Sequence, residues 1–225
     1  MTTQNYEKIW TQYAERHINT EKKSGATKLL GDEWGTAEYA ARLFTTYIQP
    51  LLSPTSLVAE LGVGGGKYTI KTAAIARKIY GVDISDSMLK LAGERLADTD
   101  CQFVPVKTNG KSVNLDTASI DLFFSFDSMV HIFPYDLYIY LAEMSRFLKP
   151  KGRAVFEFAD WDTSGVTQKF LMDVNFYKEK NVISPAAFGF ISRSAIARLA
   201  EGLGMKAVSI DEVTPRTSVI ALEKQ

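Results

Sequence analysis

The chain has 225 residues, of which 26 are lysine or arginine and 26 are aspartate or glutamate, so its formal net charge is zero. This length suggests one domain with room for an appended segment. Balanced charge argues against a protein that binds nucleic acid or an anionic membrane through electrostatics. The single cysteine, Cys101, excludes an intrachain disulfide and a multi-cysteine zinc site.

The sequence shows no sign of a membrane span or a secretory signal. No uninterrupted apolar stretch approaches the ~18 residues that a membrane-spanning helix needs. The first eight residues lack the apolar core of a signal peptide. We therefore expect a cytoplasmic protein.

Hydrophobic spacing predicts helices and strands that alternate along the chain. An N-terminal helix is indicated by Tyr6, Ile9, Trp10 and Tyr13, which fall at helical spacing. Thr36 is the candidate N-cap of a second helix, which we expect to end near Tyr47. The predicted strands are residues 57–61, 78–83, 101–106, 120–125, 153–158, 206–210 and 218–222. The predicted helices among them are residues 68–78, 85–96 (capped by Ser85), 137–148 (terminated by 150–152) and 192–203. This alternation is typical of βαβ units in a doubly wound parallel sheet.

A glycine-rich loop, Glu60-Leu-Gly-Val-Gly-Gly-Gly66, lies where the first predicted strand turns into a helix. Glycines at such a turn let the backbone approach a ligand, and the helix N-terminus offers unpaired N–H groups. The loop matches neither the P-loop nor the dinucleotide fingerprint, because Leu61 and Lys67 occupy positions where those motifs need glycine or a small residue.

Two acids accompany this loop. Glu60 directly precedes it, and Asp83 ends the next predicted strand, where an acid can accept hydrogen bonds from ribose hydroxyls. A carboxylate in the first turn would repel a pyrophosphate, but it suits an ammonium or sulfonium group. An adenosine attached to an amino acid meets both conditions. The alternative is a plain glycine turn beside a solvated acid.

The glycine loop, Asp83 and the segment Arg146–Gly152 together resemble the class I S-adenosylmethionine-dependent methyltransferases over roughly residues 30–225. The resemblance implies an α/β fold: a Rossmann-like, doubly wound, mostly parallel sheet of about seven strands with helices on both faces. The last strand is expected to be antiparallel. The resemblance also implies S-adenosylmethionine as cofactor and S-adenosylhomocysteine as product.

The chain is expected to have two parts. Residues 1–35 would form an N-terminal helical or lid segment, in which Tyr6, Trp10 and Tyr13 either fold over the cofactor or pack on the core. The resemblance implies that residues 36–225 form the methyltransferase domain. Within that domain, residues 163–191 would form an insertion that shapes the substrate pocket.

The family's cofactor contacts transfer to matching positions in this sequence. The resemblance implies that the glycine loop holds the methionine end and that the acid after the second strand holds the ribose. The implied cofactor-binding residues are Glu60 (amino group), Gly62, Gly64 and Gly66 (methionine end), Asp83 (ribose), Ile84 (adenine face), Asn109 (adenine edge) and Phe126 (sulfur end). Trp34 is added because it lies in a glycine-flanked loop and not on a periodic face.

A narrower resemblance concerns the methyl acceptor. Residues 30–35, 108–110 and 126–131 look like a bacterial branch with members that methylate sugars or other small hydroxylated metabolites. It implies in-line transfer of the methyl group to an oxygen of a sugar or natural product. The expected partner is thus a small-molecule acceptor, with no nucleic acid or membrane, and the chain is expected to be a monomer or homodimer.

A hydroxyl acceptor needs a group that removes its proton. His131 is the first candidate, because the unperturbed pKa of histidine is roughly 6.5, and Asp127 and Asp160 follow it. The alternative for His131 is a structural role. The alternative for the two aspartates is a divalent metal site, which is possible but not favoured, so no metal ligand is assigned.

Two other functions remain open at this stage. A nicotinamide-dependent oxidoreductase could use a similar sheet, although Lys67 in the third-glycine position argues against it. A methyltransferase-like protein could also bind S-adenosylmethionine without catalysing transfer.

Overall fold

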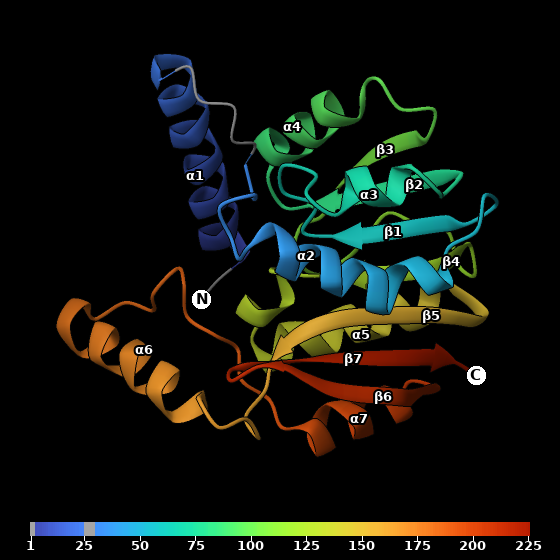
Figure 1. Ribbon diagram of the computed structural model, residues 1–225. Coiled ribbons are helices and arrows are strands. Elements are labelled where there is room, and N and C mark those ends of the chain that lie inside the picture. Colours follow the sequence, from blue (N-terminus) through green and yellow to red (C-terminus); the bar gives the residue numbers. More distant parts are fainter. Residues whose placement is uncertain (1–2, 25–29) are drawn as a thin grey trace.

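One mixed sheet organises the computed structural model, which describes residues 3–24 and 30–225 (Figure 1). Its strand order is β3-β2-β1-β4-β5-β7-β6. The strands are β1 (Leu57–Leu61), β2 (Lys78–Asp83), β3 (Gln102–Lys107), β4 (Ile120–Ser125), β5 (Leu148–Ala159), β6 (Met205–Thr214) and β7 (Thr217–Lys224). Strands β1 to β5 pair in parallel, and β7 pairs antiparallel with both β5 and β6. The expected mostly parallel, doubly wound sheet with an antiparallel last strand is confirmed.

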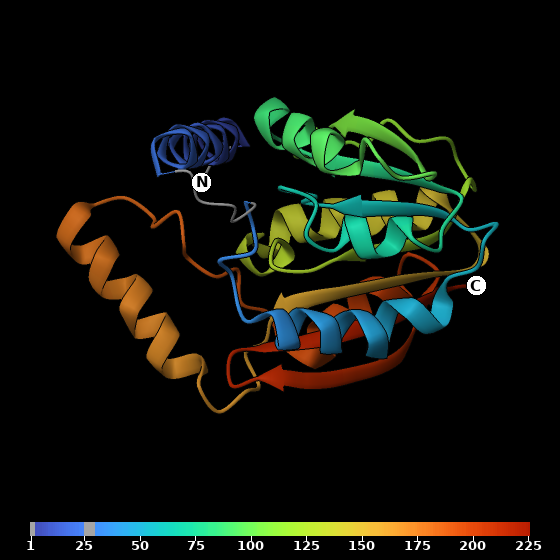
Figure 2. The same cartoon turned by 45° about the horizontal axis from the view of Figure 1, so that its top comes forward.

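Helices cover both faces of this sheet (Figures 1 and 2). The α-helices are α1 (Thr3–Ser24), α2 (Ala37–Leu43), α3 (Thr69–Ala73), α4 (Asp86–Leu96), α5 (Pro134–Phe147), α6 (Val166–Lys180) and α7 (Arg193–Glu201). Short π and 3-10 turns are η1 (Phe44–Ile48), η2 (Gln49–Leu51) and η3 (Met129–His131). Helices α5 and α7 pack into one buried apolar cluster, whereas α2, η1 and α3 pack into another.

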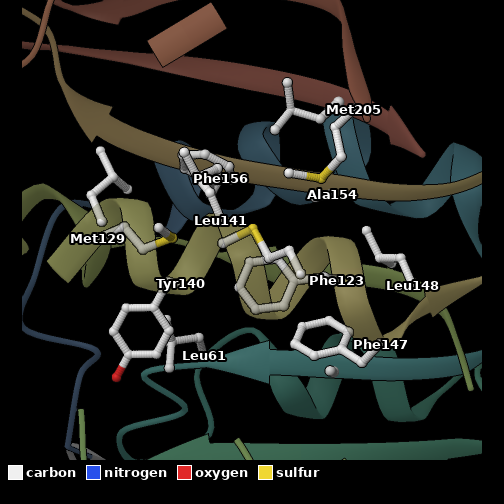
Figure 3. Close-up of a cluster of buried hydrophobic side chains, with 14 of the residues drawn as sticks. Leu61, Phe123, Met129, Tyr140, Leu141, Phe147, Leu148, Ala154, Phe156 and Met205 are labelled. Carbon is white, nitrogen blue, oxygen red and sulfur yellow. The ribbon is translucent and has the colours of Figure 1, made fainter. Parts of the chain in front are cut away.

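Strand β4 shows how the sequence fills both clusters. Successive side chains of a strand point to opposite faces. Accordingly, Phe123 belongs to the cluster under α5, and Leu122 and Phe124 belong to the cluster under α2. Figure 3 shows Phe123 among Leu141 and Phe147 of α5. Each such fully buried side chain contributes roughly 1.5–3 kcal/mol of stability.

The sequence predicts the start of a helix correctly where a hydroxyl side chain caps the backbone. The Thr36 Oγ1 atom accepts a hydrogen bond from the Tyr39 N–H at 3.1 Å, and the Ser85 Oγ atom accepts one from the Met88 N–H at 3.4 Å. These bonds satisfy N–H groups that have no partner inside the first turn of a helix. Both predicted caps are confirmed.

Helix ends were read less well. The predicted helix 68–78 shrinks to α3, and the helix after Thr36 changes to a π turn at Phe44. Helix α5 ends at Phe147, and β5 already begins at Leu148, so residues 150–152 lie in a strand and not in the expected terminating turn. The physical reason is a shift in the pairing of β4 with β5. Ile120 of β4 pairs with Leu148, whereas Leu122 pairs with Arg153, so the residues between Leu148 and Arg153 interrupt the ladder within β5.

Helices α1 and α6 stand apart from the two packed layers. Figures 1 and 2 show both at the end of the sheet where the arrows of β1 and β5 terminate. Ligands of doubly wound sheets bind at this end. No helix in the described ranges is long and apolar enough to cross a membrane.

Candidate active site

A cavity opens at the carboxyl ends of β1, β2 and β4, below α1. It holds about 810 Å³ of empty space when its open mouth is counted. The lining residues are Tyr6, Trp10, Trp34, Leu61, Gly62, Gly64, Asp83, Ile84, Met88, Thr108, Gly110, Asp127, Ser128, His131, Ile132, Asp136 and Tyr140. Seven of the residues predicted from the sequence are among them: Trp34, Gly62, Gly64, Asp83, Ile84, Asp127 and His131.

The first glycine of the loop is required by sterics. Gly62 has φ +73°, and a Cβ atom there would lie 2.0 Å from the Ser128 Oγ atom. The same hydroxyl donates to the Gly62 carbonyl oxygen at 3.2 Å. A side chain at this position would therefore clash with Ser128, so glycine is needed where the loop packs against the segment after β4.

Asp83 links the loop to the end of β2. Its Oδ2 atom accepts a hydrogen bond from the Gly64 N–H at 3.1 Å, and its Oδ1 atom accepts one from the Ser85 N–H at 2.9 Å. Burial raises the pKa of Asp83 to about 6, against the opposing effect of these bonds. Each carboxylate oxygen keeps a second lone pair, and the residue lines the cavity, so Asp83 can accept further hydrogen bonds from a ligand.

Glu60 lies behind the loop and does not line the cavity. Its side chain is buried, and among the described residues its Oε2 atom has no hydrogen-bond partner. Burial raises the pKa of Glu60 to about 8, and the charge of Asp83 adds to the rise. The loop therefore rests on a carboxyl group that is largely protonated at neutral pH.

Three predicted cofactor contacts face elsewhere. Gly66 packs against α4, where an added Cβ atom would lie 3.2 Å from the Arg95 side chain. The Asn109 Oδ1 atom accepts hydrogen bonds from the backbone N–H groups of Lys111 and Ser112, both at 2.9 Å. Phe126 is buried against the Tyr68 ring, with centroids 5.1 Å apart. Next to Asn109, Thr108 and Gly110 line the cavity instead.

Asp160 is a structural residue in this fold. It is fully buried, and its Oδ2 atom contacts the Arg193 Nε atom at 2.6 Å and the Ser218 hydroxyl at 2.5 Å. Its Oδ1 atom accepts the Asp162 N–H at 2.9 Å. Since Oδ2 is committed to α7 and β7 and Oδ1 to the backbone two residues on, the prediction that Asp160 acts in catalysis is corrected.

Asp127 follows β4 in a left-handed backbone conformation, with φ +60°. Its Oδ2 atom forms a 3.0 Å ion pair with the Lys67 Nζ atom, and its N–H donates to the Glu157 Oε2 atom at 3.4 Å. Lys67 also donates to the Trp34 carbonyl oxygen. The lysine that breaks the dinucleotide fingerprint therefore ties the Trp34 loop to the segment after β4.

His131 ends η3 and lines the cavity with a defined tautomer. Its Nδ1 atom lies 3.1 Å from the carbonyl oxygen of Ala187. A carbonyl oxygen only accepts, so Nδ1 carries the proton and Nε2 keeps its lone pair. Among the described residues, Nε2 has no hydrogen-bond partner. Burial lowers the pKa of His131 below its ordinary value, so the imidazole is neutral at neutral pH.

The predicted site residues leave out part of this lining, and four of the residues left out share helical spacing. Tyr6 and Trp10 face the cavity from α1, and Asp136 and Tyr140 face it from α5. In each pair the residues are four positions apart and therefore lie on one face of a helix. The α5 pair follows His131 within nine residues, which was the available signal. In the described ranges, no group of three or more histidine, cysteine, aspartate or glutamate residues is arranged to hold a metal ion.

Comparison with known proteins gives one family match. Residues 58–152, which run from β1 into β5, match the family model described as a methyltransferase domain. No protein with a curated description matches the chain in sequence.

Several solved structures share this architecture. The geranyl diphosphate C-methyltransferase from Streptomyces coelicolor A3(2), solved with Mg²⁺, geranyl-S-thiolodiphosphate and S-adenosyl-L-homocysteine, is 15% identical, with 98% of each chain covered and a TM-score of 0.68. The PH0226 protein from Pyrococcus horikoshii OT3 is 18% identical, with 86% of this chain and 94% of that chain covered and a TM-score of 0.64. An S-adenosylmethionine dependent methyltransferase from Mesorhizobium loti is 14% identical, with 78% and 93% covered and a TM-score of 0.61. At these identities the likeness shows a common fold.

Proposed function

We propose that this chain, a class I S-adenosylmethionine-dependent methyltransferase, methylates an oxygen of a small, uncharged hydroxylated molecule with His131 as general base. The observation that carries the proposal is the orientation of the imidazole. Its Nδ1 atom is engaged by the Ala187 carbonyl, and the ring lines the cavity in its neutral form. A positioned neutral base is what a hydroxyl acceptor requires.

The cavity has the chemistry that S-adenosylmethionine needs. Asp83 would hold the ribose hydroxyls, and the backbone at Gly62 and Gly64 would hold the methionine end. Ile84 and Met88 provide apolar contacts for the adenine. The lone pairs that remain on Asp83 at the cavity wall are consistent with this placement. When bound, the cofactor supplies an electrophilic methyl group on a sulfonium.

In this arrangement His131 would accept the acceptor's hydroxyl proton at Nε2, while the bound cofactor would supply the methyl group and leave as S-adenosylhomocysteine. The Nδ1–H bond to Ala187 holds the ring while the charge on the imidazole changes. A positioned general base contributes about 10²–10⁴-fold to a rate. Trp10 and Trp34 border the same space with their rings in edge contact.

The charge of the lining supports an uncharged acceptor. In the described part of the chain, the charged side chains that line the cavity are the carboxylates Asp83, Asp127 and Asp136. Asp83 and Asp136 would repel a diphosphate such as the one bound by the Streptomyces C-methyltransferase, whereas the charge of Asp127 is paired with Lys67. Aromatic and aliphatic walls formed by Trp10, Trp34 and Ile132 suit the ring of a sugar or a natural product.

An amine acceptor is the second candidate. Carboxylates and aromatic faces together attract a cation, and Asp136 lies in this cavity beside Tyr6 and Trp10. A protonated amine would be bound well, but it must lose a proton before it can attack, so His131 would serve it in the same way.

The test is release of S-adenosylhomocysteine from purified protein with matched acceptor pairs, in which each sugar or phenol is compared with its amino analogue. The variants are His131→Gln and, as the control, His17→Gln at the other histidine of the chain. We expect turnover of hydroxylated acceptors that falls about 10²–10⁴-fold in His131→Gln. Cofactor affinity should remain within about twofold, and His17→Gln should match the native rate.

Each contrary result has a distinct meaning. Full activity of His131→Gln would remove the histidine from the mechanism. Turnover of amino analogues alone would replace oxygen by nitrogen as the acceptor atom. Binding of the cofactor without turnover of either class would contradict the proposed acceptors.

A further inference from the structure

Helix α6 carries a buried lysine on an otherwise exposed element. Its apolar residues Leu171 and Met172 are 51% and 59% exposed, whereas Lys169 is only 7% exposed. Figures 1 and 2 show α6 projecting away from the sheet. A buried ammonium group is unfavourable unless it is paired and hydrogen-bonded, so the contacts of Lys169 need an explanation.

Those contacts converge on one short segment, residues 184–190. The Lys169 Nζ atom lies 2.5 Å from the Asp173 Oδ1 atom, 3.0 Å from the Ala186 carbonyl oxygen and 4.5 Å above the centre of the Phe188 ring. Asp173 then accepts the Phe188 N–H on its Oδ2 atom at 3.2 Å. The ion pair is thus hydrogen-bonded to both neighbours of Ala187, through Lys169 to Ala186 and through Asp173 to Phe188.

Ala187, which lies between these two contacts, is the residue that binds the candidate base His131. The Ala187 carbonyl oxygen is the hydrogen-bond partner of His131 Nδ1 at 3.1 Å. The Phe188 ring also meets the His131 ring edge-on, with centroids 5.4 Å apart. Every contact of α6 described above therefore lies within one residue of the group that sets the histidine tautomer.

The segment is also fixed on its other side. The Gly189 N–H donates to the Val130 carbonyl oxygen at 2.8 Å. A Cβ atom at Gly189 would lie 2.0 Å from the Ile132 carbonyl oxygen. The two segments that carry the Nδ1 donor and its acceptor are packed directly on each other.

We propose that Lys169 and Asp173 are positioning residues that hold the Ala187 carbonyl against His131, which keeps the proton on Nδ1 and the lone pair on Nε2. Which ring nitrogen of a neutral histidine carries the proton is set by the hydrogen bonds of the ring, here the bond from Nδ1 to the Ala187 carbonyl oxygen. The catalytic consequence of this clamp rests on the proposed function, whereas the effect on the tautomer does not.

The electrostatics around the ring agree with this assignment. Burial is the main cause of the lowered pKa of His131, and the positive charge of Lys169 adds to it. The Ala187 carbonyl, Asp127 and Asp173 act in the opposite direction. A cation held by Asp173 next to Phe188 therefore favours the neutral ring without forming a hydrogen bond to it.

The test is long-range ¹⁵N–¹H correlation of the imidazole nitrogens at about pH 7.5, where the signals of His131 are assigned with His131→Gln. We expect the native ring to show Nδ1 protonated and Nε2 unprotonated. In Lys169→Met and in Asp173→Ala, the two tautomers should exchange and the Nε2–H form should appear. Lys169→Arg keeps the charge and the donors and should restore the native pattern.

Lys178→Met is the matched control, because Lys178 lies on the exposed side of the same helix. An unchanged His131 tautomer in folded Lys169→Met or Asp173→Ala would overturn the proposal, and so would an equal change in Lys178→Met. Asp173→Ala leaves the lysine in place, so it decides the question if Lys169→Met does not fold.

Turnover separates this inference from the proposed function. If His131 is the base, kcat in Lys169→Met should fall by up to about 100-fold with the cofactor KM unchanged, because misplacing a catalytic group by about 1 Å has an effect of that size. A shifted tautomer with an unchanged kcat would confirm the clamp and reject His131 as the base.

Discussion

The Tyr6 hydroxyl donates a 2.6 Å hydrogen bond to the backbone carbonyl oxygen of His131. This bond joins α1 to the segment that carries the candidate base. Further polar contacts hold the same helix, namely Thr11 Oγ1 to Ser85 Oγ at 3.0 Å and Lys107 Nζ to Glu7 Oε1 at 2.7 Å. Helix α1 is therefore fastened over the cavity by these directional bonds together with an apolar cluster, in which Trp10, Tyr13 and Ala14 of α1 pack with Leu30 and Met88.

Tyr6→Phe should loosen α1 while keeping the ring that lines the cavity. One hydrogen bond contributes roughly 0.5–1.5 kcal/mol, so amide exchange in α1 should accelerate about two- to tenfold, with α5 unchanged. Hydrogen exchange followed by mass spectrometry measures this. Tyr135→Phe is the control, because Tyr135 is 90% exposed. Equal exchange in native protein and Tyr6→Phe would show that the bond does not hold the helix.

The pH dependence of turnover should follow the neutral form of His131. Because burial lowers its pKa, kcat should be level at and above neutral pH and fall about tenfold per pH unit once the pH is below that pKa. The decline should begin below about pH 6.5. His17→Gln should leave the profile unchanged. A midpoint above about pH 7 would contradict the assignment of this residue.

Glu60→Gln should change how stability depends on pH. The pKa of Glu60 is raised in the folded state to about 8, so the folded protein binds its proton more tightly than the unfolded chain, and stability falls as pH rises toward that value. Between about pH 7 and 8 the loss should be on the order of 1 kcal/mol, and Glu60→Gln should lack it. Urea denaturation at both pH values measures the difference.

The control for this experiment is Glu94→Gln. Glu94 has an exposed side chain that pairs with Lys90 at 3.8 Å. Its stability should keep the native pH dependence. A native slope in Glu60→Gln would mean that the buried carboxyl is not the group that titrates.

Gly62→Ala should damage both the loop and the cofactor site. The added Cβ atom would lie 2.0 Å from the Ser128 hydroxyl at φ +73°, and a strained backbone position costs about 1–3 kcal/mol. We expect a lower melting temperature and at least a tenfold weaker affinity for S-adenosylmethionine by calorimetry. Gly93→Ala is the control, since an added Cβ atom there meets only the Phe103 ring at 3.8 Å.

Gly93 lies inside α4, so Gly93→Ala should leave cofactor affinity unchanged and stabilise the protein by roughly 0.5–1 kcal/mol. Native affinity in Gly62→Ala would place the cofactor away from this turn. The pair separates a requirement for glycine from a general intolerance of added methyl groups.

Local signals account for what the sequence predicts well. The glycine loop directly follows β1, and Asp83 ends β2, so their place at the cavity follows from the order of strand, turn and helix. Thr36 and Ser85 cap the backbone three residues away. In each case the residues that interact are close in sequence or lie at the same end of adjacent parallel strands.

Contacts between distant residues explain the errors. From the sequence alone, Asp160 is a candidate catalytic acid because it follows a strand. In the fold it is bonded by Arg193 and Ser218, which are 33 and 58 positions further along the chain. The clamp could not be predicted for the same reason, because Lys169 of α6 contacts Ala186, 17 positions further along, in an irregular connection whose path no periodicity describes. Asn109 shows the opposite, local effect. Its Oδ1 atom accepts hydrogen bonds from the backbone of its own turn, and these bonds compete with hydrogen bonds to a ligand.

The position of β7 governs how this chain can fold. It follows every other strand in sequence, yet it lies inside the sheet between β5 and β6. Strand β5 therefore waits for a partner some 60 residues further along the chain, from Ala159 to Thr217 at the near end of the ladder. Until β7 docks, β5 is an open edge of buried apolar residues, which is prone to pairing with other chains. Pairings this distant in sequence are slow to form, so completion of the sheet at β7 is the expected rate-limiting step of folding.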